Sequence, residues 1–204
     1  VLFPSGSMSL VEPIYKGNAA MDHFNRVAGD AIRAHVEARA ARGGSDRVRI
    51  VEVGAGMGST TEWVIRTLGD AAPRVEYVYT DVSEGFLQLG RRSFGARLPA
   101  ISFAALDVER GVVEQGFDAG SFDIVIATNV LHATRRLPET LRHVKALLKT
   151  NGWLVLNEGT RNQDFLTFTF GLLKGWWAYE DESNRLPGGP LVSAAGWTRL
   201  LQDS

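Results

Sequence analysis

The chain has 204 residues, of which 45% are hydrophobic and 22% are charged, a balance typical of one globular domain with a buried core. Its net charge of −1 excludes the broad basic surface that nucleic acid or an anionic membrane would require. The absence of cysteine excludes disulfides, thiolate catalysis and cysteine-based metal sites, and it favours a cytoplasmic location.

The first 47 residues precede the first predicted strand. Residues 1–8 (VLFPSGSM) are interpreted as the remnant of a tag, outside the fold. Residues 9–47 form an N-terminal segment in which apolar residues recur every three or four positions from Asn18 to about Arg42, a pattern that predicts an amphipathic helix. We expect this helix to act as a lid and residues 48–204 to form the core.

Strands and helices alternate through the core. Runs rich in β-branched and aromatic residues predict strands at 48–53, 75–80, 101–105 and 122–127, and a fifth beginning at 153–156. Helical patterns are found at 60–68, 83–94, 138–149 and 193–202. This alternation favours an α/β fold whose parallel sheet carries helices on both faces.

A glycine-rich turn follows the first strand, where Gly54, Gly56 and Gly58 occupy alternate positions after Glu52. Glycines there let the backbone turn sharply and approach a ligand closely. A dinucleotide fingerprint would need its third glycine at Ser59, which disfavours a nicotinamide dehydrogenase. The pattern resembles the cofactor loop of Rossmann-like methyltransferases, in which Glu52 would meet the amino-acid end of S-adenosylmethionine.

Two further acids stand at strand ends. Asp81 ends the second predicted strand, where such folds place a carboxylate that accepts both ribose hydroxyls. Asp107, with Val108, closes the third strand, and the resemblance implies contact with the adenine. The alternative is that these acids are ordinary residues at the ends of strands and bind no ligand. This alternative has more weight for Asp107 alone than for Asp81 combined with the glycine turn.

A histidine and a glutamate follow the last two strands. His132 lies just past the carboxyl end of the fourth strand, and Glu158 leaves the fifth at the same edge if the two strands are neighbours. A carboxylate there can hold one imidazole nitrogen protonated and direct the other at a substrate as a general base. Histidines and acids show no ligand spacing, so we expect no metal.

Three stretches make the resemblance specific: residues 129–134 (NVLHAT), 156–158 (LNE) and 170–177 (FGLLKGWW). Together they are similar to methyltransferase domains embedded in modular polyketide synthases, over nearly the whole chain. The resemblance implies that His132 and Glu158 form a catalytic dyad and that Asn129 helps to bind the cofactor. That core usually ends with two further strands after the segment containing Trp197, so the last strands are expected to be missing here.

Four aromatic residues are candidates for the substrate wall and the lid. Trp176 and Trp177 are expected to line an acyl pocket, although aromatic pairs more often pack in cores. Tyr15 and Phe24 are expected to lie near the site as part of the lid, with simple packing of the helix on the sheet as the alternative for Phe24.

The resemblance implies methyl transfer from S-adenosylmethionine to an intermediate carried by an acyl carrier protein. Methylation of the α carbon of a β-ketoacyl thioester is our first expectation, because it is the commoner activity in the family, and methylation of a β-hydroxyl or enol oxygen is the alternative. A non-catalytic domain that binds the cofactor or docks its neighbours is the alternative from another class. The expected partners are the carrier protein and adjacent synthase domains, without nucleic acid or membrane.

Overall fold

The structure, a computed structural model, describes residues 17–44 and 46–204, so the expected tag remnant at 1–8 and Tyr15 lie outside the described residues. The strands are β1 (Val48–Val53), β2 (Val75–Asp81), β3 (Ile101–Ala105), β4 (Phe122–Thr128) and β5 (Leu148–Asn157). They form a sheet in the order β3-β2-β1-β4-β5, in which every neighbouring pair is parallel. The predicted α/β fold with a parallel sheet is confirmed.

Helices connect and cover these strands. The α-helices are α2 (Ala19–Ala41), α3 (Ser59–Leu68), α4 (Glu84–Phe94), α5 (Leu137–Leu147), α6 (Asp164–Thr169) and α7 (Ala194–Gln202). The 3₁₀ turns are η2 (Gly69–Arg74), η3 (Val113–Gln115), η4 (Leu131–Ala133), η5 (Phe170–Leu172), η6 (Lys174–Trp177) and η7 (Glu182–Asn184). Among the described residues, no helix has the length and apolar character needed to cross a membrane.

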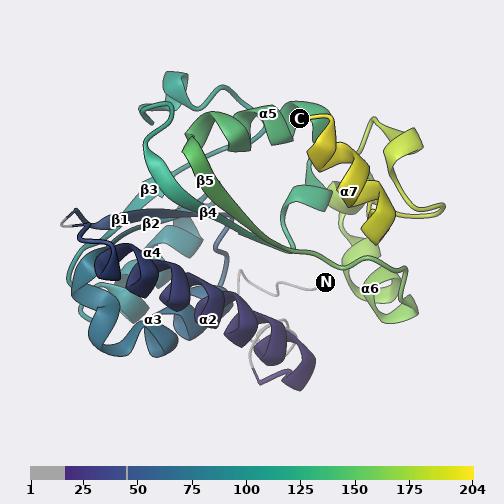
Figure 1. Cartoon of the computed structure of the whole chain (residues 1–204). Coiled ribbons are helices and arrows are strands. Elements are labelled where there is room, and N and C mark those ends of the chain that lie inside the picture. Colours follow the sequence, from purple (N-terminus) through teal and green to yellow (C-terminus); the bar gives the residue numbers. More distant parts are fainter. Residues whose placement is uncertain (1–16, 45) are drawn as a thin grey trace.

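The sheet separates two hydrophobic cores, because successive side chains of a strand point to opposite faces. On β4, Ile124 and Ile126 pack with side chains of α2, α3 and α4, whereas Val125 and Ala127 pack with those of α5 and α7. Figure 1 shows α2, α3 and α4 on one side of the sheet and α5 on the other. Helices on both faces make a parallel sheet that is buried throughout its centre.

The long N-terminal helix begins where the sequence predicts it. The Asn18 side chain caps α2 by accepting from the backbone N–H groups of Ala20 and Met21, and Ile32 and Val36 are buried against the sheet. The role of this helix as a lid stays a prediction.

The fifth strand begins earlier than predicted. The sequence predicted a helix over 138–149 and a strand beginning at 153, but α5 ends at Leu147 and β5 starts at once, with Leu148 opposite Phe122. Asn151 lies within β5 with φ of 62°, close to a register shift between Phe122 and Ile124. The pairing of β5 with β4 therefore continues across a bulge-like irregularity, at a position where the local sequence predicts a turn rather than a strand.

Candidate active site

A cavity of about 360 Å³ opens at the carboxyl ends of the strands. In parallel α/β sheets this edge is where ligands bind, next to the point at which the strand order reverses, here between β1 and β4. Its lining includes residues of the glycine turn, the ends of β2 and β4, and α2 (Met21, Asn25, Glu52, Gly54, Gly56, Asp81, Phe86, Asp107, Val108, Asn129 and Phe170 among others). Most of the predicted cofactor residues are therefore brought together.

The three glycines of the turn share a positive φ but differ in their surroundings. A Cβ on Gly54 would lie 2.3 Å from Val130 Cγ2, and one on Gly58 would lie 2.2 Å from the Phe94 ring. A Cβ on Gly56, a residue that lines the cavity, would meet only the Gly54 carbonyl within 4 Å. Two of the glycines thus allow close packing, and Gly56 keeps part of the cavity open.

Asp81, at the end of β2, is fastened to the turn. Its Oδ2 accepts from the Gly56 N–H (2.9 Å) and its Oδ1 from the Ser83 N–H (2.8 Å). Burial raises the pKa of Asp81, and the Ser83 and Gly56 N–H groups oppose that rise. A carboxylate oxygen has a second lone pair, so Asp81 can accept two further hydrogen bonds from a ligand in the cavity.

Glu52 is buried at the floor of the same cavity, with 2% of its surface exposed. Its Oε2 accepts from the hydroxyl of Tyr77 (2.6 Å) and from that of Thr61. Burial raises the pKa of Glu52 to about 7, although both hydroxyls favour the carboxylate. A group that titrates near neutral pH can take on full negative charge when a cationic ligand group approaches.

Asp107 and Val108 line the cavity from the segment after β3. The Asp107 N–H donates to Gln115 Oε1 (2.8 Å), and the Val108 carbonyl accepts from His143 Nδ1 (2.9 Å). Neither Gln115 nor His143 was singled out from the sequence. They fix the backbone of a segment that the sequence identified only through its acid.

His132 and Glu158 are in direct contact, as their positions after neighbouring strands predicted. His132 lies in η4 (Leu131–Ala133), and its Nδ1 is 2.6 Å from Glu158 Oε2. The other carboxylate oxygen, Oε1, accepts from the N–H groups of Val130 (3.0 Å) and Leu131 (2.8 Å). Because a carboxylate only accepts, Nδ1 carries the proton and Nε2 is left as the basic nitrogen.

The dyad lies beside the cavity wall. The His132 side chain is 10% exposed and that of Glu158 is 2% exposed, while the next residues, Ala133 and Thr134, line the cavity. The ring of Trp176 stands edge-on to the imidazole with centroids 5.9 Å apart. The arrangement can hold a neutral histidine in one tautomer next to a largely apolar chamber.

Asn129 connects the two halves of the site. It adopts a φ of 48°, uncommon for a residue with a side chain, and its Oδ1 accepts from the Gly159 N–H (3.1 Å). Its Nδ2 lies 3.8 Å from Met21 Sδ on α2. Asn129 therefore joins the ends of β4 and β5 to the helix that covers them.

The predicted aromatic residues separate into different surroundings. Trp176 is buried and stacks on Phe170, which lines the cavity, whereas Trp177 is 48% exposed. Phe24 is 54% exposed and is not among the lining residues; Met21 and Asn25 extend from α2 to the cavity instead. Phe86, at the start of α4, is a further lining residue that sequence reasoning missed.

No group of three or more histidines and acids gathers for a metal ion within the described ranges 17–44 and 46–204. Independently of this, the His132–Glu158 pair places an imidazole that can act as a base beside the ligand chamber, and two of the strand ends at the chamber carry carboxylates.

Comparison with known proteins identifies the family. A model of the family described as "Methyltransferase domain" matches residues 51–154, about half of the chain. Polyketide synthase ThaQ of Burkholderia thailandensis is 46% identical over 100% of this chain, which spans 10% of the length of ThaQ.

Solved structures agree with this match. The crystal structure of DszA carbon methyltransferase has a TM-score of 0.93 and 47% identity, over 99% of this chain and 52% of that chain. The trans-methyltransferase CalH, solved in complex with SAH, has a TM-score of 0.78 and 35% identity, over 98% of this chain and 52% of that chain. The chain belongs to the methyltransferase domain family, with the fold of polyketide synthase carbon methyltransferases, as the sequence motifs indicated.

Proposed function

We propose that this chain methylates the α carbon of a β-ketoacyl thioester carried by an acyl carrier protein, with S-adenosylmethionine as methyl donor. The observation that carries the proposal is the His132–Glu158 pair beside the cavity at the glycine turn, in which Nδ1 of His132 lies 2.6 Å from Oε2 of Glu158. A base next to a cofactor chamber is the arrangement that methyl transfer to an acidic carbon requires.

S-adenosylmethionine is the cofactor, as the methyltransferase family and the relative solved with SAH indicate. The residues present fit it. Gly56 leaves open space where a Cβ would otherwise stand, and Asp81 has acceptor capacity for the ribose hydroxyls. Asp107 and Val108 would face the adenine, while Glu52 would lie near the methionine end, with Asn129 close by.

The chain's own residues have one chemical task. Bound S-adenosylmethionine supplies an electrophilic methyl group, so the protein has to align donor and acceptor and remove one proton. His132 Nε2 takes the proton from the carbon between the two carbonyls, which leaves that carbon nucleophilic toward the methyl group that a bound cofactor would supply. Glu158 holds Nδ1–H and stabilises the imidazolium that forms.

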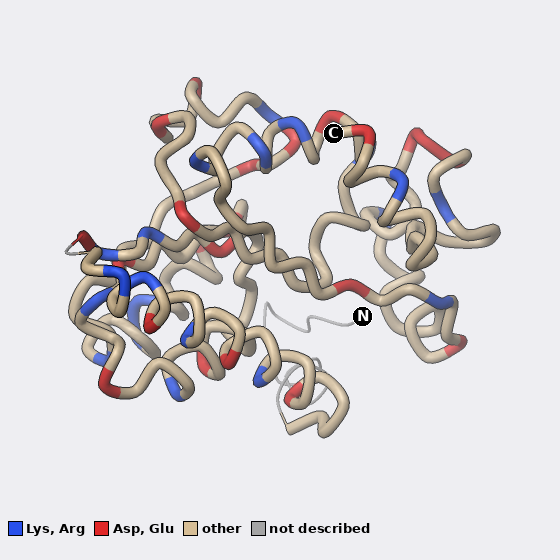
Figure 2. Tube along the Cα trace, in the orientation of Figure 1, with Lys and Arg blue, Asp and Glu red and all other residues tan. Residues whose placement is uncertain are grey.

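Carbon is favoured over oxygen as the acceptor because DszA, the 47% identical neighbour, is described as a carbon methyltransferase. A carrier-bound acceptor is supported by the similarity to polyketide synthases, in which adjacent domains and the carrier protein would be the partners. Figure 2 shows Lys and Arg interspersed with Asp and Glu along the chain, which suits contacts with proteins rather than with a nucleic-acid backbone.

The test is to incubate the chain with S-adenosylmethionine and a carrier protein loaded with either a β-ketoacyl or a β-hydroxyacyl group, and to locate the added methyl by fragmentation. We expect it on the α carbon of the β-ketoacyl group. A methyl on oxygen would overturn the carbon assignment. Binding of S-adenosylhomocysteine without any transfer would favour the non-catalytic alternative.

A further inference from the structure

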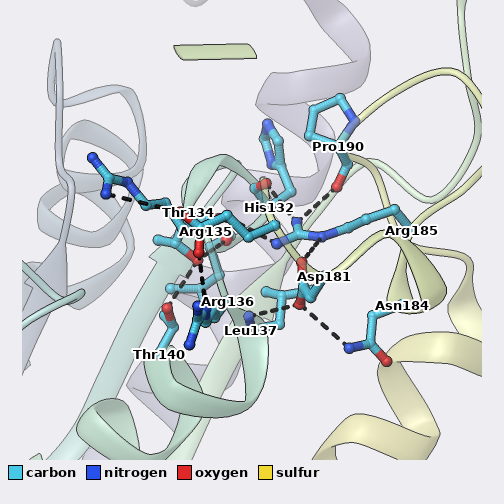
Figure 3. Close-up of polar contacts among 12 residues, drawn as sticks. His132, Thr134, Arg135, Arg136, Leu137, Thr140, Asp181, Asn184, Arg185 and Pro190 are labelled. Atoms are coloured by element: carbon cyan, nitrogen blue, oxygen red, sulfur yellow. Dashed lines mark hydrogen bonds and ion pairs between the residues drawn. The ribbon is translucent and has the colours of Figure 1, made fainter. Parts of the chain in front are cut away.

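A buried arginine stands behind the dyad, on the segment that follows the aromatic stretch. Arg185 comes directly after η7, and its side chain is 1% exposed. An arginine is almost never buried to this extent unless its charge is paired and its donors are used. Figure 3 shows its guanidinium between the backbone of His132 and Thr134 on one side and Asp181 on the other.

Four of the five guanidinium donors are used in the described contacts. Nε donates to Asp181 Oδ1 (2.6 Å), and Nη2 donates to the Thr134 carbonyl (2.8 Å). Nη1 donates both to the His132 carbonyl (2.7 Å) and to the Pro190 carbonyl (2.9 Å). A residue 53 positions away in the chain thus holds the backbone oxygen of His132 itself.

The partner carboxylate extends the same connection. Asp181 Oδ2 accepts from the N–H of Leu137, the first residue of α5, at 2.9 Å. A negative charge at a helix N-terminus is favourable. Asp181 therefore both balances the charge of the guanidinium and caps α5. The backbone from His132 to Leu137 is therefore fastened at three points by one ion pair.

His132 needs such support because η4 is a single turn. The side chain of Val130, the residue before the turn, provides no cap, and a turn of three residues has little stability of its own. Glu158 holds the imidazole and the N–H groups of Val130 and Leu131, whereas Arg185 holds the carbonyl on the opposite side. The ring is thus fixed through its Nδ1 and through its own main chain.

We propose that Arg185, with Asp181, is a positioning residue that sets the direction of the His132 base. The proposal rests on the role of His132 proposed above. Arg185 touches backbone carbonyls rather than reacting atoms, so it acts through His132. Because misplacing a base by about 1 Å costs on the order of 100-fold in rate, loss of these contacts should act on turnover more than on cofactor binding.

The test compares Arg185→Lys with Arg136→Lys. Arg136 is a matched control because its Nε also ties this backbone to the later segment, at 2.9 Å from Glu180 Oε2, but its side chain is 57% exposed and does not reach His132. We expect Arg185→Lys to lower kcat about 10- to 100-fold with an unchanged Kd for S-adenosylhomocysteine, and Arg136→Lys to change neither. In a His132→Ala background, Arg185→Lys should cost nothing further.

A spectroscopic measurement separates this proposal from the proposed function. With ¹⁵N-labelled histidine, Arg185→Lys should change the His132 ring signals, assigned by their loss in His132→Ala, while those of the other three histidines stay in place. His132 signals identical to the parent, or a rate loss that persists without His132, would overturn the proposal. If Arg185→Lys fails to fold, Asp181→Asn provides the same test. A parent that transfers no methyl counts only against the proposed function.

Discussion

The glycine turn shows how one residue type serves two purposes within the five positions from Gly54 to Gly58. All three glycines need the left-handed region, which residues with a Cβ adopt at a cost of about 1 kcal/mol or more. Beyond that shared cost, Gly54 faces Val130, whereas Gly56 faces the cavity. Stability and ligand binding should therefore respond differently at the two positions.

Alanine substitutions separate these roles. Gly54→Ala should destabilise the fold by roughly 2–4 kcal/mol, because strained backbone is combined with overpacking against Val130. Gly56→Ala should cost only about 1 kcal/mol in stability but weaken S-adenosylhomocysteine binding, since its methyl group enters the cavity. Urea unfolding and calorimetry measure the two effects. Equal losses of stability at both positions would contradict the assignment.

Substitution of either His132 or Glu158 should lower the turnover rate, by different amounts. His132→Ala should lower turnover by about 10² to 10⁴ with cofactor affinity nearly intact, because a positioned base contributes that much. Glu158→Gln should cost less, since the amide oxygen can still accept, and the double variant should be no slower than His132→Ala. Single-turnover rates on carrier-bound substrate measure this.

The exposed His23 on α2 supplies the control, and His23→Ala should methylate at the parent rate. A His132→Ala variant as fast as the parent would remove the dyad from the mechanism.

Which site residues could be predicted depends on whether their position follows from a strand end. The placement of Asp81, His132 and Glu158 at one edge could be predicted, because a parallel sheet brings its strand ends together there. The contact of Arg185 with the His132 carbonyl could not be predicted, because an arginine in an irregular segment carries no periodic signal and this partner is far away in the chain. The rotation of α2 also decides that Met21 rather than Phe24 reaches the cavity, and packing sets that rotation.

Among the elements, α2 is attached to the rest of the domain by side-chain hydrogen bonds close to the cavity. Asn25, buried in α2, accepts from the Thr60 hydroxyl of α3 (3.1 Å) and from Asn157 Nδ2 of β5 (3.4 Å). It also lines the cavity. One side chain thus connects the helix to two other elements at the ligand chamber.

Asn25→Ala should loosen α2 above the cavity. Losing two buried side-chain hydrogen bonds should lower stability by about 1–3 kcal/mol and speed amide exchange along the N-terminal half of α2. Adding S-adenosylhomocysteine should slow that exchange in the parent if the helix acts as a lid. Exchange that is the same with and without the ligand would leave α2 as simple packing on the sheet.

Element boundaries could be predicted closely for β1 to β4 but not for β5. The first four strands show local runs of β-branched and aromatic residues, and their bounds agree with expectation to within one residue. The start of β5 depends on the pairing of Leu148 with Phe122 on another strand, which no local pattern contains. Tertiary contact, rather than propensity, decides that boundary.

At the scale of the whole molecule, two buried carboxylates act in opposite directions on stability. Burial would raise the pKa of Asp123, but Lys149, the Arg49 N–H and Arg39 hold it below its usual 3.8. Its contribution is complete above pH 3.8 and is lost as the pH falls through the lowered value. Glu52, with a pKa raised from 4.5 to about 7, favours the fold fully below pH 4.5 and loses that contribution as the pH rises to about 7.

The contributions of these two groups are both complete between pH 3.8 and 4.5. Urea unfolding across pH should show a decline toward neutrality of about 3 kcal/mol from Glu52. Glu52→Gln should flatten that neutral limb, and Asp123→Asn should flatten the acid limb. A neutral limb that persists in Glu52→Gln would assign it to other groups.

The strand order also places the residues proposed to bind the methyl donor and those proposed to act on the acceptor in two different parts of the chain. The β1–β2–β3 side holds the acids and glycines proposed to bind the donor, while β4, β5 and the segment after them hold the proposed base and the cavity-lining Phe170. On the proposed function, we therefore expect a change in the second half alone to alter which acceptor is methylated. A chimera that exchanges the segment after β5 between two such domains should keep its donor and adopt the acceptor of the other parent.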